Sequence, residues 1–466
     1  MPSPSPRSAL AALSLSMLLS SLGISIANVG LPTLAHVFDA PFQAVQWIVL
    51  AYLLTITSLI VSAGRLGDLI GRRRLLLGGL ALFTTASILS GIAPTLGWLI
   101  GARALQGLGA SVMMALTMAF VGETVPKELT GSAMGLLGTM SAVGTALGPS
   151  LGGILIAAFG WPAIFLINAP LGLLAFALAY RYLPADRAPA KAGRPGFDLA
   201  GTALLAMALA AYALVMTIGH GQFGFVNLAL LSVFAIGAAL FIRVEARVPS
   251  PLIRLPLLAD PALRMGLIMS ALVSTVIMAT FIVGPFYLSQ GLGLDTAQVG
   301  AVMSIGPLTA ALTGVPAGRI ADRFGAARMT IIGLSALTIG CGLLAALPTR
   351  FGIPGYVVPL VVCTLGYALF QTANNTAVMA DIQPDQRGVV SGMLSLSRNL
   401  GLVTGASVMG AIFAFASSGA GRLVSGPAAA TGLGATFSVA AVLMLAALIL
   451  AAISQTRTLA EPQPGE

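Results

Sequence analysis

The chain has 466 residues, of which 57% are hydrophobic and 8% are charged, and it carries a formal net charge of +9. A soluble domain has about 25% charged residues, so this composition excludes an ordinary soluble protein and indicates a membrane protein with many spans. Its 55 glycines are typical of closely packed transmembrane helices.

Apolar runs of about 20 residues, the length that a helix needs to cross a bilayer, recur along the whole chain. We expect the first six spans near residues 9–31, 44–62, 75–93, 97–121, 131–156 and 162–183. After a polar stretch, two more are expected near 199–219 and 224–244. Six others follow a second polar stretch, near 265–288, 297–317, 329–347, 354–379, 388–416 and 432–453, which makes fourteen spans and an all-α membrane protein.

The basic residues outside the spans lie on alternate loops, with Arg350 and Arg422 as the two exceptions. Loops rich in lysine and arginine stay in the cytoplasm. We therefore expect a multi-pass protein of a bacterial inner membrane with both termini in the cytoplasm. The positive charge is then a topological signal, so the expected partner is the lipid bilayer and no nucleic acid is expected.

Two short charged loops separate spans at corresponding places in the chain. The first charged loop, residues 64–74, reads GRLGDLIGRRR, and its three glycines predict a tight turn. The second charged loop, residues 318–328, reads GRIADRFGAAR and begins 254 residues later. Orientation alone does not explain the repeated aspartate, because acids add little to it. The positions of interest are Gly64, Arg65, Asp68, Gly71, Arg72 and Arg73, and Gly318, Arg319, Asp322, Arg323 and Gly325.

This repetition predicts a duplicated helical unit. A set of glycines also recurs 257 residues later: Gly131, Gly135, Gly144, Gly148 and Gly153 return as Gly388, Gly392, Gly401, Gly405 and Gly410. We expect an N-terminal six-helix bundle over 1–183, an inserted two-helix segment over 184–263, and a C-terminal six-helix bundle over 264–466.

With these motifs, essentially the whole chain resembles a major facilitator superfamily transporter of the fourteen-helix drug:proton antiporter type. The resemblance implies the major facilitator fold, with two six-helix bundles and a central inserted helix pair. It also implies that the two charged loops gate transport, because in that family such loops lie where the halves meet and control their rocking.

Gly144, Gly148 and Gly152 are spaced four residues apart in the fifth span, a spacing that lets helices pack closely. Pro149 permits a bend there, and Gly153 completes a stretch that resembles the family's antiporter signature. The alternative interpretation is that these glycines serve packing alone. The second half has an alanine where Pro149 stands, so we expect the bend in the first half only.

Two arginines lie within spans, where a charge is costly and usually faces a bundle interior or a cavity. Arg103, followed by Gln106, resembles the family's buried arginine, and this resemblance implies a role in proton coupling. The alternative is that Arg103 extends to the outer interface. Arg398 lies near mid-depth, and we expect it in a substrate cavity.

Other polar and aromatic residues are expected to line the same central cavity, although each taken alone also has a structural interpretation. The expected cavity residues are Asn28, Trp47, Tyr52, Arg103, Gln106, Asn168, Tyr287, Gln290, Gln371, Asn374, Asn375, Arg398 and Asn399.

The chain departs from the family pattern in its first span. Residues 22–32 read LGISIANVGLP, with Gly23 where fourteen-helix exporters often carry an aspartate. No acid lies deep within any span, so the cavity should be positive and favour neutral or anionic substrates. The proton-coupling residue is left open, with Glu123 as a candidate.

We therefore predict a secondary transporter of small organic molecules that works by alternating access, as a monomer, with proton-coupled efflux of the multidrug type. The alternatives are uptake of a neutral or anionic metabolite, such as a riboflavin-like vitamin, and a non-transporting membrane sensor. The chain has no cofactor-binding or metal motif, and no set of groups that would make it an enzyme.

Overall fold

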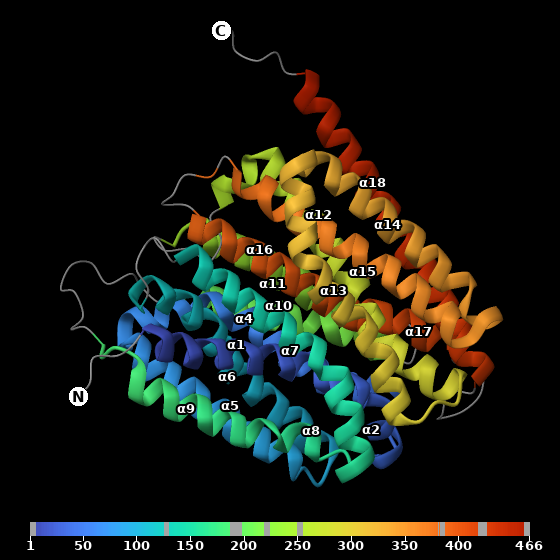
Figure 1. Ribbon diagram of the computed structural model, residues 1–466, viewed down its shortest axis with the longest axis horizontal. Coiled ribbons are helices and arrows are strands. Elements are labelled where there is room, and N and C mark those ends of the chain that lie inside the picture. Colours follow the sequence, from blue (N-terminus) through green and yellow to red (C-terminus); the bar gives the residue numbers. More distant parts are fainter. Residues whose placement is uncertain are drawn as a thin grey trace. The chain divides into compact units, whose positions relative to one another are not determined.

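The computed structural model describes residues 6–124, 130–186, 198–218, 224–248, 255–380, 382, 387–417 and 426–460. These residues form helices and their connections, and no strand occurs among them. Thirteen helices in this part of the chain are long and apolar enough to cross a membrane. Helix α13 (Thr296–Phe324), which contains Pro307 and Pro316, is the remaining long helix. The protein is therefore the expected all-α membrane protein (Figure 1).

The helices of the first half follow the predicted spans closely. They are α1 (Pro6–Val29), α2 (Leu31–Val37), α3 (Phe42–Val45), α4 (Trp47–Ile70), α5 (Arg72–Gly91), α6 (Leu96–Thr124), α7 (Thr130–Phe159), α8 (Ala163–Leu166) and α9 (Asn168–Tyr182). The inserted pair is α10 (Leu199–Thr217) and α11 (Phe225–Glu245).

The second half begins with the 3₁₀ helix η2 (Leu255–Ala259). It continues with α12 (Pro261–Phe286), the π-helical turn η3 (Tyr287–Gly291), α13, α14 (Ala326–Ala346), α15 (Pro348–Ala380), α16 (Arg387–Thr404), the π-helical turn η4 (Gly405–Met409), α17 (Gly410–Ser417) and α18 (Gly426–Ala460). Within α15, Gly352 has φ +57° and interrupts the helix near its start.

Contacts divide the chain into two units, Met1–Leu252 with Asp295–Ser304, and Ile253–Leu294 with Ile305–Glu466. In the first unit α1 packs on α7, and α6 packs on both α4 and α5. The inserted helix α10 packs on α4 and on α11, so the described part of the insertion belongs to the first unit. In the second unit α14 packs on α15 and α18, and α12 packs on α16.

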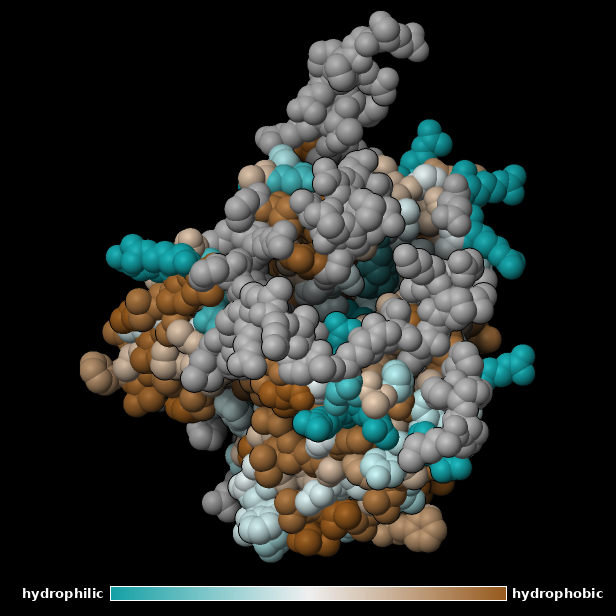
Figure 2. Space-filling view, turned by 90° about the vertical axis from the view of Figure 1, so that its left-hand side faces the viewer, coloured by the Kyte–Doolittle hydropathy of each residue, from teal (hydrophilic) through white to brown (hydrophobic). Residues whose placement is uncertain are grey.

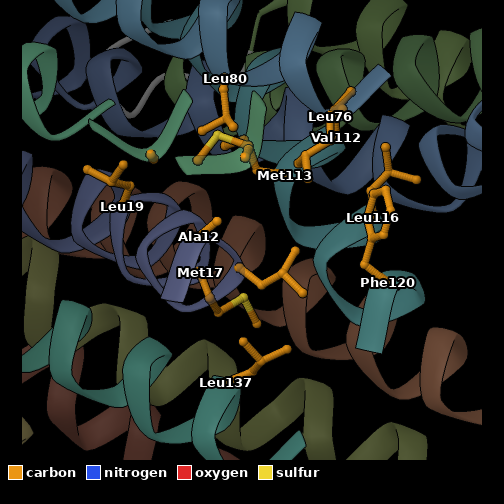
Figure 3. Packing of buried hydrophobic residues seen from close by; sticks show 14 of the residues in the cluster. Ala12, Met17, Leu19, Leu76, Leu80, Val112, Met113, Leu116, Phe120 and Leu137 are labelled. Atoms are coloured by element: carbon orange, nitrogen blue, oxygen red, sulfur yellow. The ribbon is translucent and has the colours of Figure 1, made fainter. Parts of the chain in front are cut away.

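The apolar core of the first unit is built where α1, α5, α6 and α7 meet (Figure 3). Lipid tails are as apolar as these side chains, so the packing is stabilised by close van der Waals contact more than by removal from water. The labelled core residues are Ala12, Met17, Leu19, Leu76, Leu80, Val112, Met113, Leu116, Phe120 and Leu137.

The glycines of α7 allow α1 to approach closely. A Cβ added at Gly144 or Gly148 would overlap the α1 backbone or the Ser25 side chain. The second unit repeats this contact, because a Cβ at Gly401 or Gly405 would overlap the backbone of α12. The repeated glycines therefore mark the same helix contact in both halves.

One local expectation is wrong. Helix α4 continues to Ile70, so Gly64 and Gly67 are helical, and the turn of the first charged loop lies at Gly71 with φ +104°. The backbone hydrogen bonds of α4 satisfy its polar groups through the charged segment, which a turn at Gly64 would break. In the second half, η4 forms a π-helical turn at the place that corresponds to Pro149.

The outer surface is apolar where a lipid-facing surface is required. Figure 2 shows apolar side chains over much of the face that it draws. Helix α11 is the clearest case, since Phe225 is 85% exposed and Leu228, Ile236 and Ile242 are also exposed.

Candidate functional site

A fully buried arginine lies at the centre of the first unit. Arg103 of α6 has none of its side chain exposed. Its Nε donates to the Ile48 carbonyl on α4 at 2.9 Å, and Nη2 donates to the Gly23 carbonyl on α1 at 2.9 Å. Nη1 donates to Gln106 Oε1 at 2.5 Å. The guanidinium therefore joins three helices, and the alternative of a side chain that reaches the outer interface is wrong.

Two aromatic rings and a serine that binds Gln106 complete the surroundings of Arg103. The guanidinium lies 4.2 Å from the centre of the Tyr52 ring and 5.8 Å from that of Phe165. Gln106 Nε2 donates to Ser87 Oγ at 2.7 Å, which extends the network to α5. Ring faces stabilise a desolvated cation, and the three hydrogen bonds of the Arg103 side chain go to neutral acceptors.

Gly23 of α1 contacts both Arg103 and the neighbourhood of Tyr52. Its carbonyl accepts from Arg103, and a Cβ built on it would lie 2.9 Å from Tyr52 Oη. Tyr52 Oη itself donates to the Ser20 carbonyl at 2.8 Å. The position where the sequence led us to look for an acid therefore binds the guanidinium through its backbone carbonyl.

Of the other expected cavity residues of the first unit, Asn28 and Asn168 make local hydrogen bonds and Trp47 bonds to another helix. Asn28 Nδ2 donates to the Ile24 carbonyl at 3.2 Å, and Asn168 Nδ2 donates to carbonyls of its own helix region. Trp47 Nε1 donates to Thr217 Oγ1 at 3.1 Å, which ties α4 to the inserted helix α10. Within the described residues, the amide oxygens of Asn28 and Asn168 are buried and accept no hydrogen bond.

Arg398 of α16 differs from Arg103 in its burial and in its hydrogen bonding. It is half-buried, and in the part of the chain that the structure describes its side chain makes no hydrogen bond or ion pair. Its neighbour Asn399 is 7% exposed, whereas Ser397 Oγ donates to the Leu267 carbonyl of α12 at 2.5 Å. Of the two arginines within spans, Arg398 has a guanidinium that is available to another molecule.

The remaining expected residues of the second unit fall into two groups. Tyr287 is buried and stacks on Tyr356, with ring centres 6.1 Å apart, close to the partly buried Gln290 in η3. On α15, Asn374 Nδ2 donates to the Gly266 carbonyl of α12 at 3.2 Å. Gln371 Nε2 donates to Asn375 Oδ1 at 3.4 Å on the more exposed face of the same helix.

The charged loops are only partly described. The side chains of Arg65, Asp68 and Asp322, and that of Glu123, lie outside the described residues. Arg72 Nη1 donates to the Ala119 carbonyl of α6 at 3.4 Å. In the second loop, Arg319 and Arg323 are exposed, Gly318 is within α13, and Gly325 has φ +86°.

Sequence reasoning missed three residues that the structure singles out. Ser87 belongs to the Arg103 network. Gln46 is fully buried, and neither of its amide atoms has a hydrogen-bond partner among the described residues. Asp186 binds the beginning of α5. Ser87 and Gln46 are polar residues in or beside apolar runs, which was an available signal, but Asp186 lies in a polar stretch with nothing to distinguish it.

Comparisons with known proteins agree with this architecture. A family profile described as Major Facilitator Superfamily matches residues 13–406. The riboflavin transporter RibZ of Clostridioides difficile is 31% identical over 85% of this chain and 86% of its own length. The multidrug resistance protein Stp of Mycobacterium tuberculosis is 30% identical over 87% of this chain and 75% of its own. A solved bacterial homologue of the human lysosomal transporter Spinster, inward-facing and occupied, superposes with a TM-score of 0.71 at 14% identity and covers 100% of both chains.

Proposed function

Because this chain belongs to the Major Facilitator Superfamily, we propose that it exports small organic molecules across the bacterial inner membrane by alternating access, coupled to protons. Export is supported by relatives that are named as multidrug resistance proteins and efflux pumps. The proposal includes a monomer with both termini in the cytoplasm, two six-helix bundles over 1–183 and 264–466, and the inserted segment 184–263 between them in sequence.

The proposed substrate class rests on the difference between Arg103 and Arg398. Arg103 donates to three neutral acceptors and is enclosed by rings, so it is not available to a ligand. Arg398 keeps its donors unused in the described part of the chain. A guanidinium within a span attracts acceptor-rich or anionic groups. We therefore infer substrates that are neutral with carbonyl groups, or weakly anionic, over lipophilic cations.

The other expected cavity residues take secondary roles in this proposal. Tyr287, Gln290, Gln371, Asn374, Asn375 and Asn399 are proposed to support substrate binding in the second unit, and Asn28 in the first. Trp47, Tyr52, Gln106 and Asn168 are proposed to hold the helices that form the cavity. The two charged loops are proposed to gate the exchange between the inward and outward states.

The test is transport in energised inside-out membrane vesicles with labelled cationic, neutral and anionic compounds. We expect accumulation of neutral or anionic compounds that a protonophore abolishes, and loss of accumulation with Arg398→Ala. The matched control is Arg350→Ala, an exposed arginine at the start of α15 that should transport like the wild type. Preferential accumulation of cationic dyes would contradict the substrate class, and retained transport in the Arg398 variant would remove that residue from the site.

A second candidate function is uptake of a riboflavin-like vitamin, which the similarity to a riboflavin transporter favours. The sequence has no acid deep within a predicted span, which is compatible with this substrate because it is neutral and rich in carbonyl groups. Right-side-out vesicles discriminate the two functions. Accumulation of riboflavin in them, with no drug accumulation in inside-out vesicles, would replace export by uptake.

A further inference from the structure

The first charged loop turns at one residue, and a carboxylate occupies the space beside it. Gly71 has φ +104° and precedes the first turn of α5. A Cβ at this position would lie 2.5 Å from Asp186 Oδ2 and 2.6 Å from its Cγ. A side chain at residue 71 is thus excluded twice, by the left-handed backbone and by the carboxylate of a residue more than 100 positions away in the chain.

Asp186 holds the beginning of α5 through two backbone amides. Its Oδ1 accepts from the Arg73 amide at 2.7 Å and its Oδ2 accepts from the Arg74 amide at 3.2 Å. The first amides of a helix have no partner within the helix, and a carboxylate there also interacts favourably with the helix dipole. The carboxylate that caps α5 therefore comes from Asp186, a residue that follows α9.

The Arg73 side chain makes a second connection to the same region. Its Nη2 donates to the Tyr180 carbonyl, and its guanidinium lies 5.3 Å from the centre of the Tyr180 ring. Tyr180 is in the last turn of α9, and α5 and α9 pack side by side (Figure 1). The start of α5 is therefore held at the end of α9 by two connections, one from the Asp186 carboxylate to backbone amides and one from the Arg73 side chain to Tyr180.

Among the described residues, the second charged loop has no counterpart of this contact. Gly325, which corresponds to Gly71 in the second charged loop, has φ +86°, and a Cβ on it would meet no described atom within 4 Å. The two charged loops therefore share a turn with positive φ, and in the described part of the chain a carboxylate contacts the glycine of the first turn only.

We propose that Asp186 is a positioning residue for transport, which holds the turn at Gly71 and so sets the conformation of the first charged loop. This inference rests on the proposed gating function of that loop. The segment 187–197 follows Asp186 directly and leads to the inserted helix pair. Asp186 thus contacts the end of the first charged loop and, in sequence, directly precedes the segment between the first six helices and the inserted pair.

The experiment compares the wild-type protein with Asp186→Ala and Asp186→Asn by two measurements. Hydrogen exchange of the detergent-solubilised protein reports the amides of Arg73 and Arg74, and we expect about tenfold faster exchange in the alanine variant. Transport of the best substrate is expected to lose maximal rate by roughly fivefold or more, with KM within about twofold, because gating changes while the binding site does not.

The matched control is Asp260→Ala. Asp260 also caps a helix, with its Oδ1 accepting from the Ala262 amide of the adjoining α12 at 2.9 Å, and it lies outside both charged loops. We expect faster exchange at Ala262 and an unchanged maximal rate of transport. An equal loss of rate in the two alanine variants would reduce Asp186 to a general helix cap.

The two measurements separate the inference from the proposed function. Unchanged exchange at Arg73 and Arg74 in Asp186→Ala overturns the connection itself, whatever the protein transports. Faster exchange with an unchanged maximal rate overturns its role in gating. A wild-type protein that transports none of the compounds overturns the proposed function and, with it, the gating role, while exchange still decides whether Asp186 holds the turn.

Discussion

Replacement of Arg103 by alanine should destabilise the first unit strongly. The substitution removes three hydrogen bonds, two that join α6 to Ile48 of α4 and Gly23 of α1, and one to Gln106 within α6. It also removes the cation between the rings of Tyr52 and Phe165 and leaves a cavity in a fully buried site. The buried Gln106 Oε1 would then lose its hydrogen-bond donor.

The magnitude follows from the bonds that are lost. Each hydrogen bond to a charged group contributes about 1.5–3 kcal/mol, and the cation–π contact about 1–2 kcal/mol. The cost of burying the guanidinium offsets several kcal/mol of this gain. A net loss of about 3–5 kcal/mol remains, which for a unit of this size lowers the melting temperature by about 6 °C or more.

The assay is thermal unfolding of the purified protein in detergent, followed by size-exclusion chromatography after heating. Arg398→Ala is the matched control, because it removes an arginine from a span without breaking a described hydrogen bond, and its melting temperature should stay within about 2 °C of the wild type. Transport should show the reverse pattern, with Arg398→Ala folded and impaired. An Arg103→Ala protein as stable as the wild type would refute the assignment of Arg103 as the connection between three helices.

Three further predictions test the packing and the insertion. Gly148→Ala should lower the melting temperature by several degrees, because the new Cβ overlaps α1 at a cost of about 1–3 kcal/mol. The control is Gly138→Ala, where no described atom lies within 4 Å of the new Cβ, and it should be neutral or slightly stabilising. Equal effects of the two substitutions would contradict the contact between α1 and α7. The hydroxyl oxygens of Ser62 and Thr202 lie 2.5 Å apart, so cysteines at these two positions should form a disulfide under mild oxidation. After cleavage at a protease site engineered between α4 and α10, the two fragments should then migrate together on a non-reducing gel. Separation of the fragments would show that the insertion docks elsewhere. Gly23→Ala should lower the melting temperature, because the new Cβ would lie 2.9 Å from Tyr52 Oη and must displace that ring; an unchanged melting temperature would contradict the close contact of α1 with α4.

The sequence alone predicted the spans, the duplication and a close helix contact at the glycines of α7, whereas the structure identified α1 as the partner. These features depend on local patterns: a run of apolar residues is helical in a membrane because its backbone must satisfy its own hydrogen bonds, and glycines four residues apart form a flat face wherever the helix packs. The resemblance to the superfamily also came from contiguous motifs, and the family profile confirmed it over residues 13–406.

Only the tertiary structure decided what the buried polar groups do. Arg103 is bound by the carbonyls of Gly23 and Ile48, and a backbone carbonyl is present at every residue, so no sequence pattern marks it as an acceptor. The difference between Arg103 and Arg398 depends on how each helix is rotated and on what packs against it. Asp186 lies far from Arg73 in the chain and gains its role because α9 ends beside the start of α5. Hydrophobicity is a property of a segment and can be read along the chain, whereas a hydrogen bond needs two groups that only the fold brings together.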